Sequence, residues 1–180
     1  MRVISGKARS VVLKAQNGMA TRPTADRVKE ALFSIIQFDL PGANVLDLFG
    51  GTGQLGIEAL SRGAKHAVFI DIQHSACKVI LENLNKTGFS ELAQVVCMDY
   101  EKYLKCTSEK FDIILLDPPY AEVFLENSLN IITEIDILQT HGIIVTERPL
   151  GKELSLNFDG YLRSKDYKYG NVLLTLYRKS

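Results

Sequence analysis

The chain has 180 residues, of which 46% are apolar, so it is long enough for one core and short for two average domains. Its 21 basic and 21 acidic residues leave no net charge, which by itself argues against a nucleic-acid partner. The longest apolar runs, such as 113–116, fall far below the roughly 20 residues of a membrane helix, and no signal-peptide core follows the N-terminal basic residues.

The three cysteines, Cys77, Cys97 and Cys106, lie far apart and form no CxxC or Cys/His pattern. We expect them to be reduced, partly buried packing residues, and we expect no metal site and no membrane contact. These observations predict a single cytoplasmic domain that acts as a monomer.

The N-terminal segment is basic although the whole chain is neutral. Residues 1–30 hold seven Lys and Arg against Asp26 and Glu30, and local charge rather than total charge attracts a polyanion. Short apolar groups, a glycine at Gly6 and the pair Asn17-Gly18 predict a β-hairpin or extended arm over 1–22, before a compact domain over 23–180. The candidate RNA-binding residues of this region are Arg2, Lys7, Arg9, Arg22 and Arg27.

The rest of the chain reads as alternating helices and strands. Thr24 stands where it could cap a helix whose apolar residues recur at helical spacing to about Phe38. Short apolar runs at 45–49, 67–70, 94–97, 112–116 and 142–145 then alternate with helix-compatible stretches, which predicts a mostly parallel sheet with helices on both faces. Two further strands, 161–167 and 172–177, flank a turn and should add an antiparallel hairpin at the edge of a seven-stranded Rossmann-like sheet.

A glycine-rich turn between the first strand and the next helix predicts a cofactor site. Gly51, Gly53 and Gly56 satisfy GxGxxG, and Asp71 ends the following strand 20 residues after Gly51, so a dinucleotide fingerprint is formally met. Asp47, however, stands beside the place where a dinucleotide puts its anionic pyrophosphate. A carboxylate there repels a dinucleotide and attracts S-adenosylmethionine, which brings a sulfonium and an ammonium against one carboxylate.

The predicted ligand is therefore S-adenosylmethionine. Asp71 can accept both ribose hydroxyls, Asp99 can accept from the adenine amino group or else cap the helix that follows it, and Tyr100 can line the adenine ring. The predicted cofactor-binding residues are Asp47, Phe49, Gly50, Gly51, Gly53, Asp71, Ile72, Asp99 and Tyr100.

The tetrapeptide Asp117-Pro118-Pro119-Tyr120 predicts the chemistry. It follows an apolar strand, so it should lie at the carboxyl edge of the sheet beside the glycine loop. An amino group conjugated to a base ring is a poor nucleophile; the Asp117 carboxylate and the Pro118 carbonyl can each accept one N–H and aim its lone pair at a methyl group. The prolines stiffen the turn and Tyr120 can stack on the base, which predicts catalytic roles for Asp117, Pro118, Pro119 and Tyr120.

With these motifs in view, the chain resembles the RsmD-type methyltransferases, which modify guanine N2 in bacterial small-subunit ribosomal RNA. The resemblance covers essentially the whole chain and rests on 1–4 with 6–7, 21–24 with 26–33, 47–53, 60–64, 117–120 and the final hairpin. It implies that Asp47, Gly50, Gly53, Asp71 and Asp99 bind the cofactor, that 117–120 perform transfer, and that the arm meets ribosomal RNA or a small-subunit assembly particle. Gly50 and Thr52 stand where the family usually has Ala and Ser.

Several alternatives stay open at this stage. The same acceptors would suit adenine N6 in DNA or RNA, or a glutamine amide of a protein; an NAD-binding oxidoreductase and a non-catalytic ribosome assembly factor are further readings. Arg22 and Arg27 could contact either the cofactor or RNA phosphate. Glu147, at the end of the fifth strand, either faces the active cleft or is a solvent-exposed carboxylate.

Overall fold

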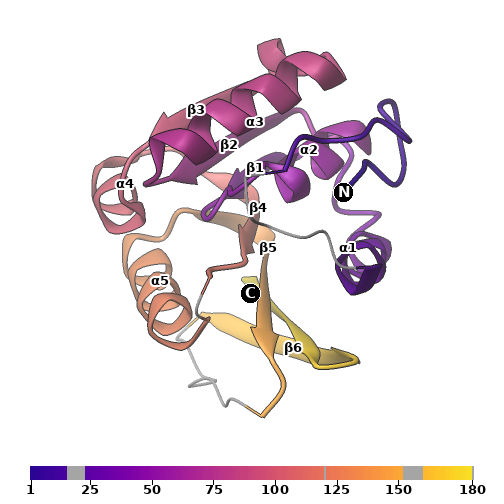
Figure 1. The fold of residues 1–180 in the computed structure, drawn as a ribbon. Helices are drawn as coiled ribbons and strands as arrows, with labels where there is room; N and C mark the ends of the chain where they lie inside the picture. The colour runs from indigo at the N-terminus through magenta and orange to yellow at the C-terminus, as the bar shows by residue number, and fades with distance from the viewer. Residues whose placement is uncertain (16–22, 120, 152–159, 180) are drawn as a thin grey trace.

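A computed structural model describes residues 1–15, 23–119, 121–151 and 160–179 of the chain. Within these residues, seven strands form one sheet in the order β3-β2-β1-β4-β5-β7-β6 (Figure 1). The elements are α1 (Pro23–Ile35), β1 (Asn44–Asp47), α2 (Gln54–Ser61), β2 (His66–Asp71), α3 (His74–Thr87), a 3₁₀ turn (Ser90–Leu92), β3 (Ala93–Cys97), α4 (Tyr100–Cys106), β4 (Phe111–Leu116), α5 (Ala121–Ile135), β5 (Leu138–Pro149), β6 (Tyr161–Tyr169) and β7 (Val172–Lys179).

The first five strands are parallel, and the chain order reverses direction between β1 and β4. β7 pairs antiparallel with β5, and β6 pairs antiparallel with β7 at the outer edge. The predicted fold class is confirmed. The antiparallel strand itself is β7, one position in from the edge, because it must enter beside β5 while its hairpin partner β6 lies outermost.

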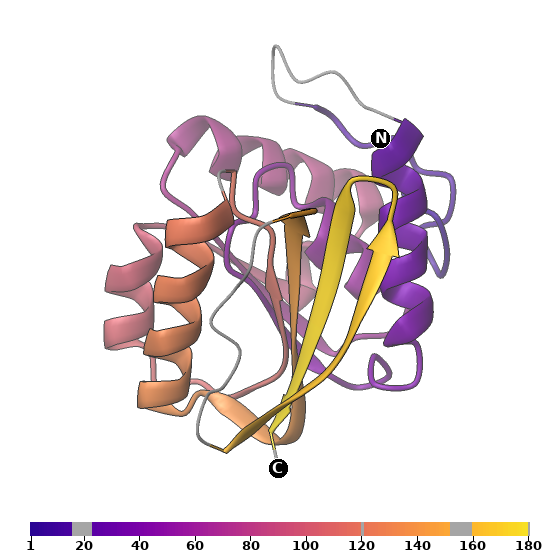
Figure 2. The ribbon, with the colours of Figure 1, turned by 90° about the horizontal axis from the view of Figure 1, so that it is seen from below.

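Helices cover both faces of the sheet, because successive strand residues point to opposite sides. On one face the strands contribute Val45, Ile113 and Ile143 to a core with α1, α2 and α3; on the other, Leu46 and Ile114 pack against α4 and α5. Figure 2 shows this layering, with the orange α5 and pink α4 on one side of the sheet and the dark purple α1 on the other.

The element boundaries differ from the sequence prediction in a few places. α1 begins at Pro23, so Thr24 lies within its first turn, and the helix ends at Ile35 rather than near Phe38. β5 begins at Leu138, four residues before the predicted start at Gly142. Of the cysteines, Cys77 is buried, whereas Cys97 and Cys106 are exposed; the expectation of partly buried packing holds only for Cys77.

The N-terminal arm is packed on the body rather than projecting from it. Within residues 1–15, an antiparallel bridge joins Arg2 and Val12, and the N–H groups of Val3 and Leu13 donate to the carbonyls of Val11 and Met1 at 3.0 and 3.1 Å. This part of the arm therefore folds back on itself. Val3, Ala8 and Leu13 are buried in the core on the α1 face. The arm gains its fixed position by burying these apolar side chains, because isolated hairpins are only marginally stable in water.

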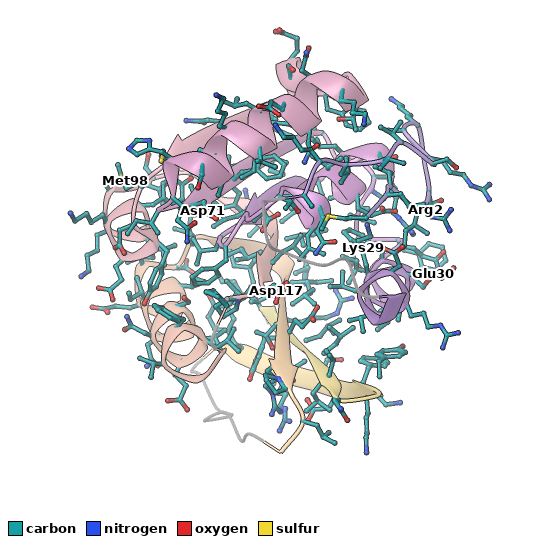
Figure 3. The ribbon with its side chains drawn as sticks, in the orientation of Figure 1. Arg2, Lys29, Glu30, Asp71, Met98 and Asp117 are labelled. Atoms are coloured by element: carbon teal, nitrogen blue, oxygen red, sulfur yellow. The ribbon has the colours of Figure 1, made fainter. Side chains whose placement is uncertain are left out.

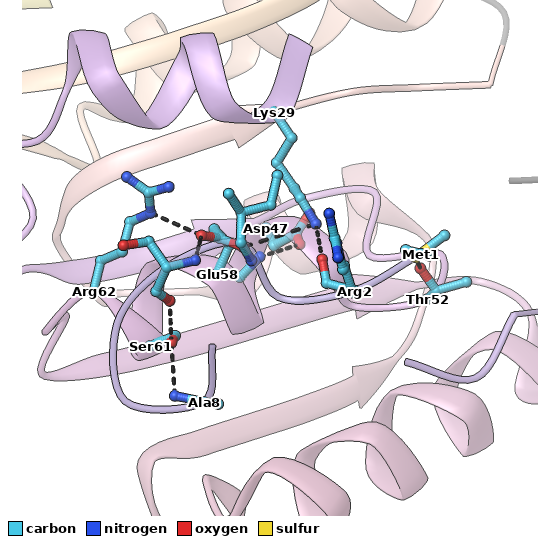
Figure 4. A network of polar contacts seen from close by, with 12 residues as sticks. Met1, Arg2, Ala8, Lys29, Asp47, Thr52, Glu58, Ser61 and Arg62 are labelled. Carbon is cyan, nitrogen blue, oxygen red and sulfur yellow. Dashed lines mark hydrogen bonds and ion pairs between the residues drawn. The ribbon is translucent and has the colours of Figure 1, made fainter. Parts of the chain in front are cut away.

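A buried carboxylate also holds the arm by its backbone. Glu58 of α2 is fully buried; its Oε2 accepts the N–H of Ile4 at 2.8 Å and its Oε1 accepts the N–H of Ser5 at 3.0 Å. Arg62 donates its Nε–H to Glu58 at 2.8 Å, and Lys29 Nζ lies 3.7 Å from Glu58 and donates to the Arg2 carbonyl at 2.7 Å (Figure 4). The charges of Lys29 and Arg62 offset the cost of burying Glu58.

We expect Glu58→Gln to destabilise the protein by about 3–5 kcal/mol, because it leaves Lys29 buried without its counter-charge and turns an amide N–H₂ toward backbone donors. Urea unfolding measures the loss. The matched control is Glu82→Gln, since Glu82 also reaches the arm, through Lys14, but both side chains are exposed and such a pair contributes little to stability. Equal losses for the two variants would contradict this account of the arm.

Candidate active site

The loops after β1, β2, β3 and β4 meet at the carboxyl edge of the sheet, which is where open α/β sheets bind ligands. They enclose a cavity of about 380 Å³, a size suited to a small-molecule cofactor. Eight of the nine predicted cofactor-binding residues line it: Asp47, Phe49, Gly50, Gly51, Asp71, Ile72, Asp99 and Tyr100. Asp117, Pro118 and Pro119 line the same cavity, whereas Tyr120 lies outside the described residues.

Gly53 does not line the cavity but shapes the turn that does. It precedes α2 with φ of 78°, a left-handed conformation that glycine adopts without strain, and it donates its N–H to the Gly50 carbonyl at 2.7 Å. Gly56 has a different role: a Cβ there would lie 2.2 Å from the ring of Phe69. This glycine therefore lets α2 pack closely on β2. Gly53 and Gly56 thus support the shape of the site without lining the cavity.

Asp47 is the most enclosed acid of the site. Its side chain is 1% exposed and its Oδ2 accepts the N–H of Gly56 at 3.0 Å. Burial raises the pKa of Asp47 to about 7, and the nearby charges of Asp117 and Asp71 add to the rise, while the Gly56 hydrogen bond opposes it. Asp47 is thus an acid at a desolvated position whose charged form a cation would stabilise and a phosphate would not.

Asp71 and Asp99 are occupied with backbone donors as well as lining the cavity. Asp71 accepts the N–H of Gly51 at 2.9 Å through Oδ2 and that of Gln73 at 2.8 Å through Oδ1. Asp99 caps α4 by accepting the N–H groups of Glu101 and Lys102 on Oδ1. The helix-cap reading of Asp99 is therefore correct. A carboxylate has about four acceptor positions, so both residues keep acceptor capacity for a ligand.

Aromatic rings form one wall of the cavity. Tyr100 packs against Phe49 with ring centroids 5.1 Å apart and against Phe124 of α5 at 5.8 Å. Asn127 donates to the Tyr100 hydroxyl at 2.9 Å and fixes the ring. Ile72 is 65% exposed although it lines the cavity, so an apolar surface lies open at the mouth where a flat ring could be covered.

The Asp117-Pro118-Pro119 turn extends directly from β4. Asp117 is half-buried, Pro118 is buried and Pro119 is exposed. Burial raises the pKa of Asp117, to about 6. Figure 3 places Asp117 near the middle of this edge, with Asp71 and Met98 on one side and Arg2, Lys29 and Glu30 on the other.

The basic residues of the arm lie apart from the cofactor cavity. Arg2, Arg9 and Arg27 are exposed and line a separate cleft of about 630 Å³ between the arm and α1. Arg27 is absent from the described lining of the cofactor cavity, so its side chain faces the cleft. Lys7 lines a third depression beside α2, and Arg22 lies outside the described residues.

Some residues of the cavity were not among those predicted from the sequence. Met1, Thr52, Gln54, Leu55, Gln73 and Met98 also line the cavity. Thr52, Gln54 and Leu55 follow from their place around the glycine turn, and Gln73 from its place after Asp71. Met1 and Met98 were not inferred from such positions. Met1 reaches the cavity only through the packing of the arm, where Thr52 donates to its sulfur.

Metal-ligand clusters and membrane spans are both absent from the described part of the chain. Its titratable and thiol side chains include no group of three or more His, Cys, Asp or Glu placed to hold a metal ion. Among the helices described there, each is too short or too polar to traverse a bilayer.

Comparison with known proteins gives consistent matches over the full length. Residues 1–178 match the family model described as conserved hypothetical protein 95. The chain is 39% identical to "Putative rRNA methyltransferase YlbH" of Bacillus subtilis, covering 99% of both, and 32% identical to "Ribosomal RNA small subunit methyltransferase D" of Haemophilus influenzae, covering 99% of this chain and 93% of that protein. A solved structure, "Putative methyltransferase yhhF from Escherichia coli", superposes with a TM-score of 0.90 at 27% identity, covering 100% and 98%.

The raised pKa of Asp47 predicts a pH-dependent stability. The folded chain binds this proton between about pH 4 and about pH 7, where the unfolded chain has released it, so stability falls as the pH rises through that window. Asp47→Asn keeps an acceptor for Gly56 and removes the titration. We expect the variant to be more stable than the wild type at pH 8 by about 2–4 kcal/mol and nearly equal to it at pH 4 in urea unfolding.

Asp136→Asn is the control for this prediction. Asp136 is exposed, and hydrogen bonding to Lys179 and Lys110 lowers its pKa, so its stabilising effect appears as the pH rises and its removal should weaken the fold slightly at pH 8. If the wild type loses no stability relative to Asp47→Asn between pH 4 and pH 8, then ionising Asp47 costs no free energy of folding and the prediction is wrong.

Proposed function

The chain belongs to the family described as conserved hypothetical protein 95, and on that premise we propose that it transfers a methyl group from S-adenosylmethionine to the N2 amino group of a guanine in small-subunit ribosomal RNA. Its curated relatives at 39% and 32% identity bear methyltransferase names, so the predicted family, the methyltransferase class and the cofactor are confirmed. The names of these relatives support ribosomal RNA as the substrate. The resemblance of the motifs supports guanine N2 as the methylated atom.

The residues of the cavity fit this cofactor. When bound, S-adenosylmethionine supplies an electrophilic methyl group on a sulfonium. The buried carboxyl of Asp47 offers a counter-charge to a cation, Asp71 offers acceptors to paired hydroxyls, and the wall formed by Phe49, Tyr100 and Ile72 suits a flat ring. Negative charge in the cavity at Asp47, Asp71 and Asp99 is unfavourable for a pyrophosphate, which weighs against an NAD-binding oxidoreductase.

The observation that carries the proposal is that Asp117 and Pro118 line the cavity that also contains Asp47. Asp117 accepts one N–H of the target amino group and the Pro118 carbonyl accepts the other. The nitrogen lone pair is thereby directed toward the cavity, which is the orientation that in-line transfer requires. As the nitrogen gains positive charge, the Asp117 carboxylate stabilises it and can take the departing proton.

The basic cleft supports an RNA substrate. Arg2, which lines this cleft with Arg9 and Arg27, lies on the side of Asp117 opposite the cavity residues Asp71 and Met98, so a nucleic-acid backbone in the cleft could present a base to the site between them (Figure 3). The arm that carries Arg2 is fixed by Glu58, so the basic residues are preorganised rather than loosely tethered.

The direct test is to incubate the protein and radiolabelled S-adenosylmethionine with unmodified small-subunit particles, free ribosomal RNA and DNA, and to identify the labelled nucleoside. We expect N2-methylguanosine from the RNA or the particle. We expect Asp117→Ala to lower the transfer rate by at least about 100-fold while calorimetric cofactor affinity stays within a few-fold. Unchanged turnover in Asp117→Ala, or label only in N6-methyladenosine or in protein, would refute the proposal.

The arm makes a second prediction. We expect the double variant Arg9→Gln, Arg27→Gln to bind ribosomal RNA more weakly and to lower the slope of log affinity against log salt by roughly 0.7–0.9 for each charge that contacts phosphate. Lys65→Gln, an exposed lysine just before β2 at the opposite edge of the sheet, is the control and should leave the slope unchanged. Equal slopes for the wild type, the double variant and Lys65→Gln would show that RNA phosphate does not contact Arg9 or Arg27.

A further inference from the structure

A second carboxyl group stands beside Asp117 at the carboxyl edge. β4 and β5 are parallel and in register, with Leu115 opposite Val145 and Leu116 opposite Thr146. The next position along the two strands brings Asp117 and Glu147 side by side. Adjacent strands lie about 4.8 Å apart and aligned residues point to the same face, so the two carboxyl groups are neighbours.

Buried side chains of β5 and β7 adjoin Glu147. Val145 and Ile143, two and four positions earlier in β5, are buried on the α1 face, so Glu147 points to that face too. Its partner on the other side is Leu174 of β7, which is fully buried. Glu147 is itself half-buried, so it is not a fully solvent-exposed carboxylate, and its position facing the active cleft stays a prediction.

Of the two carboxyl groups, Glu147 holds a proton more readily. Burial raises the pKa of Glu147, and the adjacent Asp117 raises it further, to about 8. Two neighbouring carboxyl groups in a desolvated site do not both ionise readily, so one of them tends to keep its proton. Glu147 can accept a hydrogen bond in either state, because even a protonated carboxyl group keeps a carbonyl oxygen that accepts.

We propose that Glu147 is the residue that selects guanine: its carboxyl accepts the ring N1–H while Asp117 and the Pro118 carbonyl hold the adjacent amino group. This inference rests on the proposed function, because it assigns a role toward the same base. Guanine places an N–H donor at N1 next to its N2 amino group. Adenine and 2-aminopurine have a bare acceptor at that ring nitrogen, which would face the Glu147 oxygen without a hydrogen bond.

The test compares two RNA substrates that keep the N2 amino group. One carries guanosine at the methylated position and the other carries 2-aminopurine riboside there, introduced by ligation. The proteins are the wild type, Glu147→Leu, Glu147→Gln and the control Glu134→Leu, an exposed glutamate on α5. Calorimetry with S-adenosylmethionine checks that each variant is folded, since Glu147 is absent from the described lining of the cofactor cavity.

We expect the wild type and Glu134→Leu to prefer guanosine in kcat/KM by about 10–100-fold, the effect of one buried hydrogen bond. Glu147→Leu should lose this preference to within about threefold by slowing on guanosine alone, and Glu147→Gln should retain it, because its amide can donate to Asp117 and accept from N1–H. Cofactor affinity should stay within about threefold throughout.

Two outcomes overturn the inference without touching the proposed function: Glu147→Leu keeps the preference, or Glu147→Gln loses as much guanosine activity as Glu147→Leu. Should Glu147→Leu fail to bind cofactor, Glu147→Ala replaces it and is judged by the same ratio. A wild type that methylates neither RNA, in contrast, refutes the proposed function itself.

Discussion

The burial of carboxyl groups at the ends of adjacent parallel strands is the constraint on which this site depends. Asp47 ends β1, Asp117 follows β4 and Glu147 lies near the end of β5, so in-register pairing brings their charges to one edge of the sheet. Taking such groups out of water is unfavourable, and their pKa values rise accordingly. By holding these carboxyl groups at the edge of the sheet, the fold provides a region that favours a cationic ligand and a row of hydrogen-bond acceptors. Methylation of an amino group requires both.

The same device, a buried carboxylate that accepts backbone N–H groups, also shapes the rest of the molecule. Asp47 accepts from Gly56 at the start of α2, and Asp71 accepts from Gly51 in the glycine loop. Glu58 accepts from the arm and is neutralised by Lys29 and Arg62. The difference lies in the counter-charge: Glu58 has cations of the chain beside it, whereas for Asp47 the nearby charges are acids that raise its pKa further. Glu58 is therefore suited to hold structure and Asp47 to hold a ligand.

Much of this arrangement was predictable from sequence because it depends on short motifs and a topological rule. Asp47 and Asp117 each end an apolar run, and parallel strands alternating with helices bring such ends together. The arm was less predictable: the contacts of Glu58 with Ile4 and Ser5 span more than 50 residues and have no local pattern. Glu147 was ambiguous because its burial depends on β7 packing beside β5, which is a tertiary fact. Tyr120 and Arg22 lie outside the described residues, so their assigned roles stay predictions.

The topology also places the predicted cofactor-binding acids and the proposed base-binding acids on different halves of the sheet. β1, β2 and β3 carry Asp47, Asp71 and Asp99 into the cofactor cavity, and they lie on one side of the reversal in strand order. β4 and β5 carry Asp117 and Glu147 on the other side, toward the face where the arm and α1 form the basic cleft. Under the proposed function, a base that enters from the arm side meets the cofactor at Asp117 and Pro118, which line the cofactor cavity. Because β4 neighbours β1 directly, Asp117 is the position from which a side chain can serve both halves.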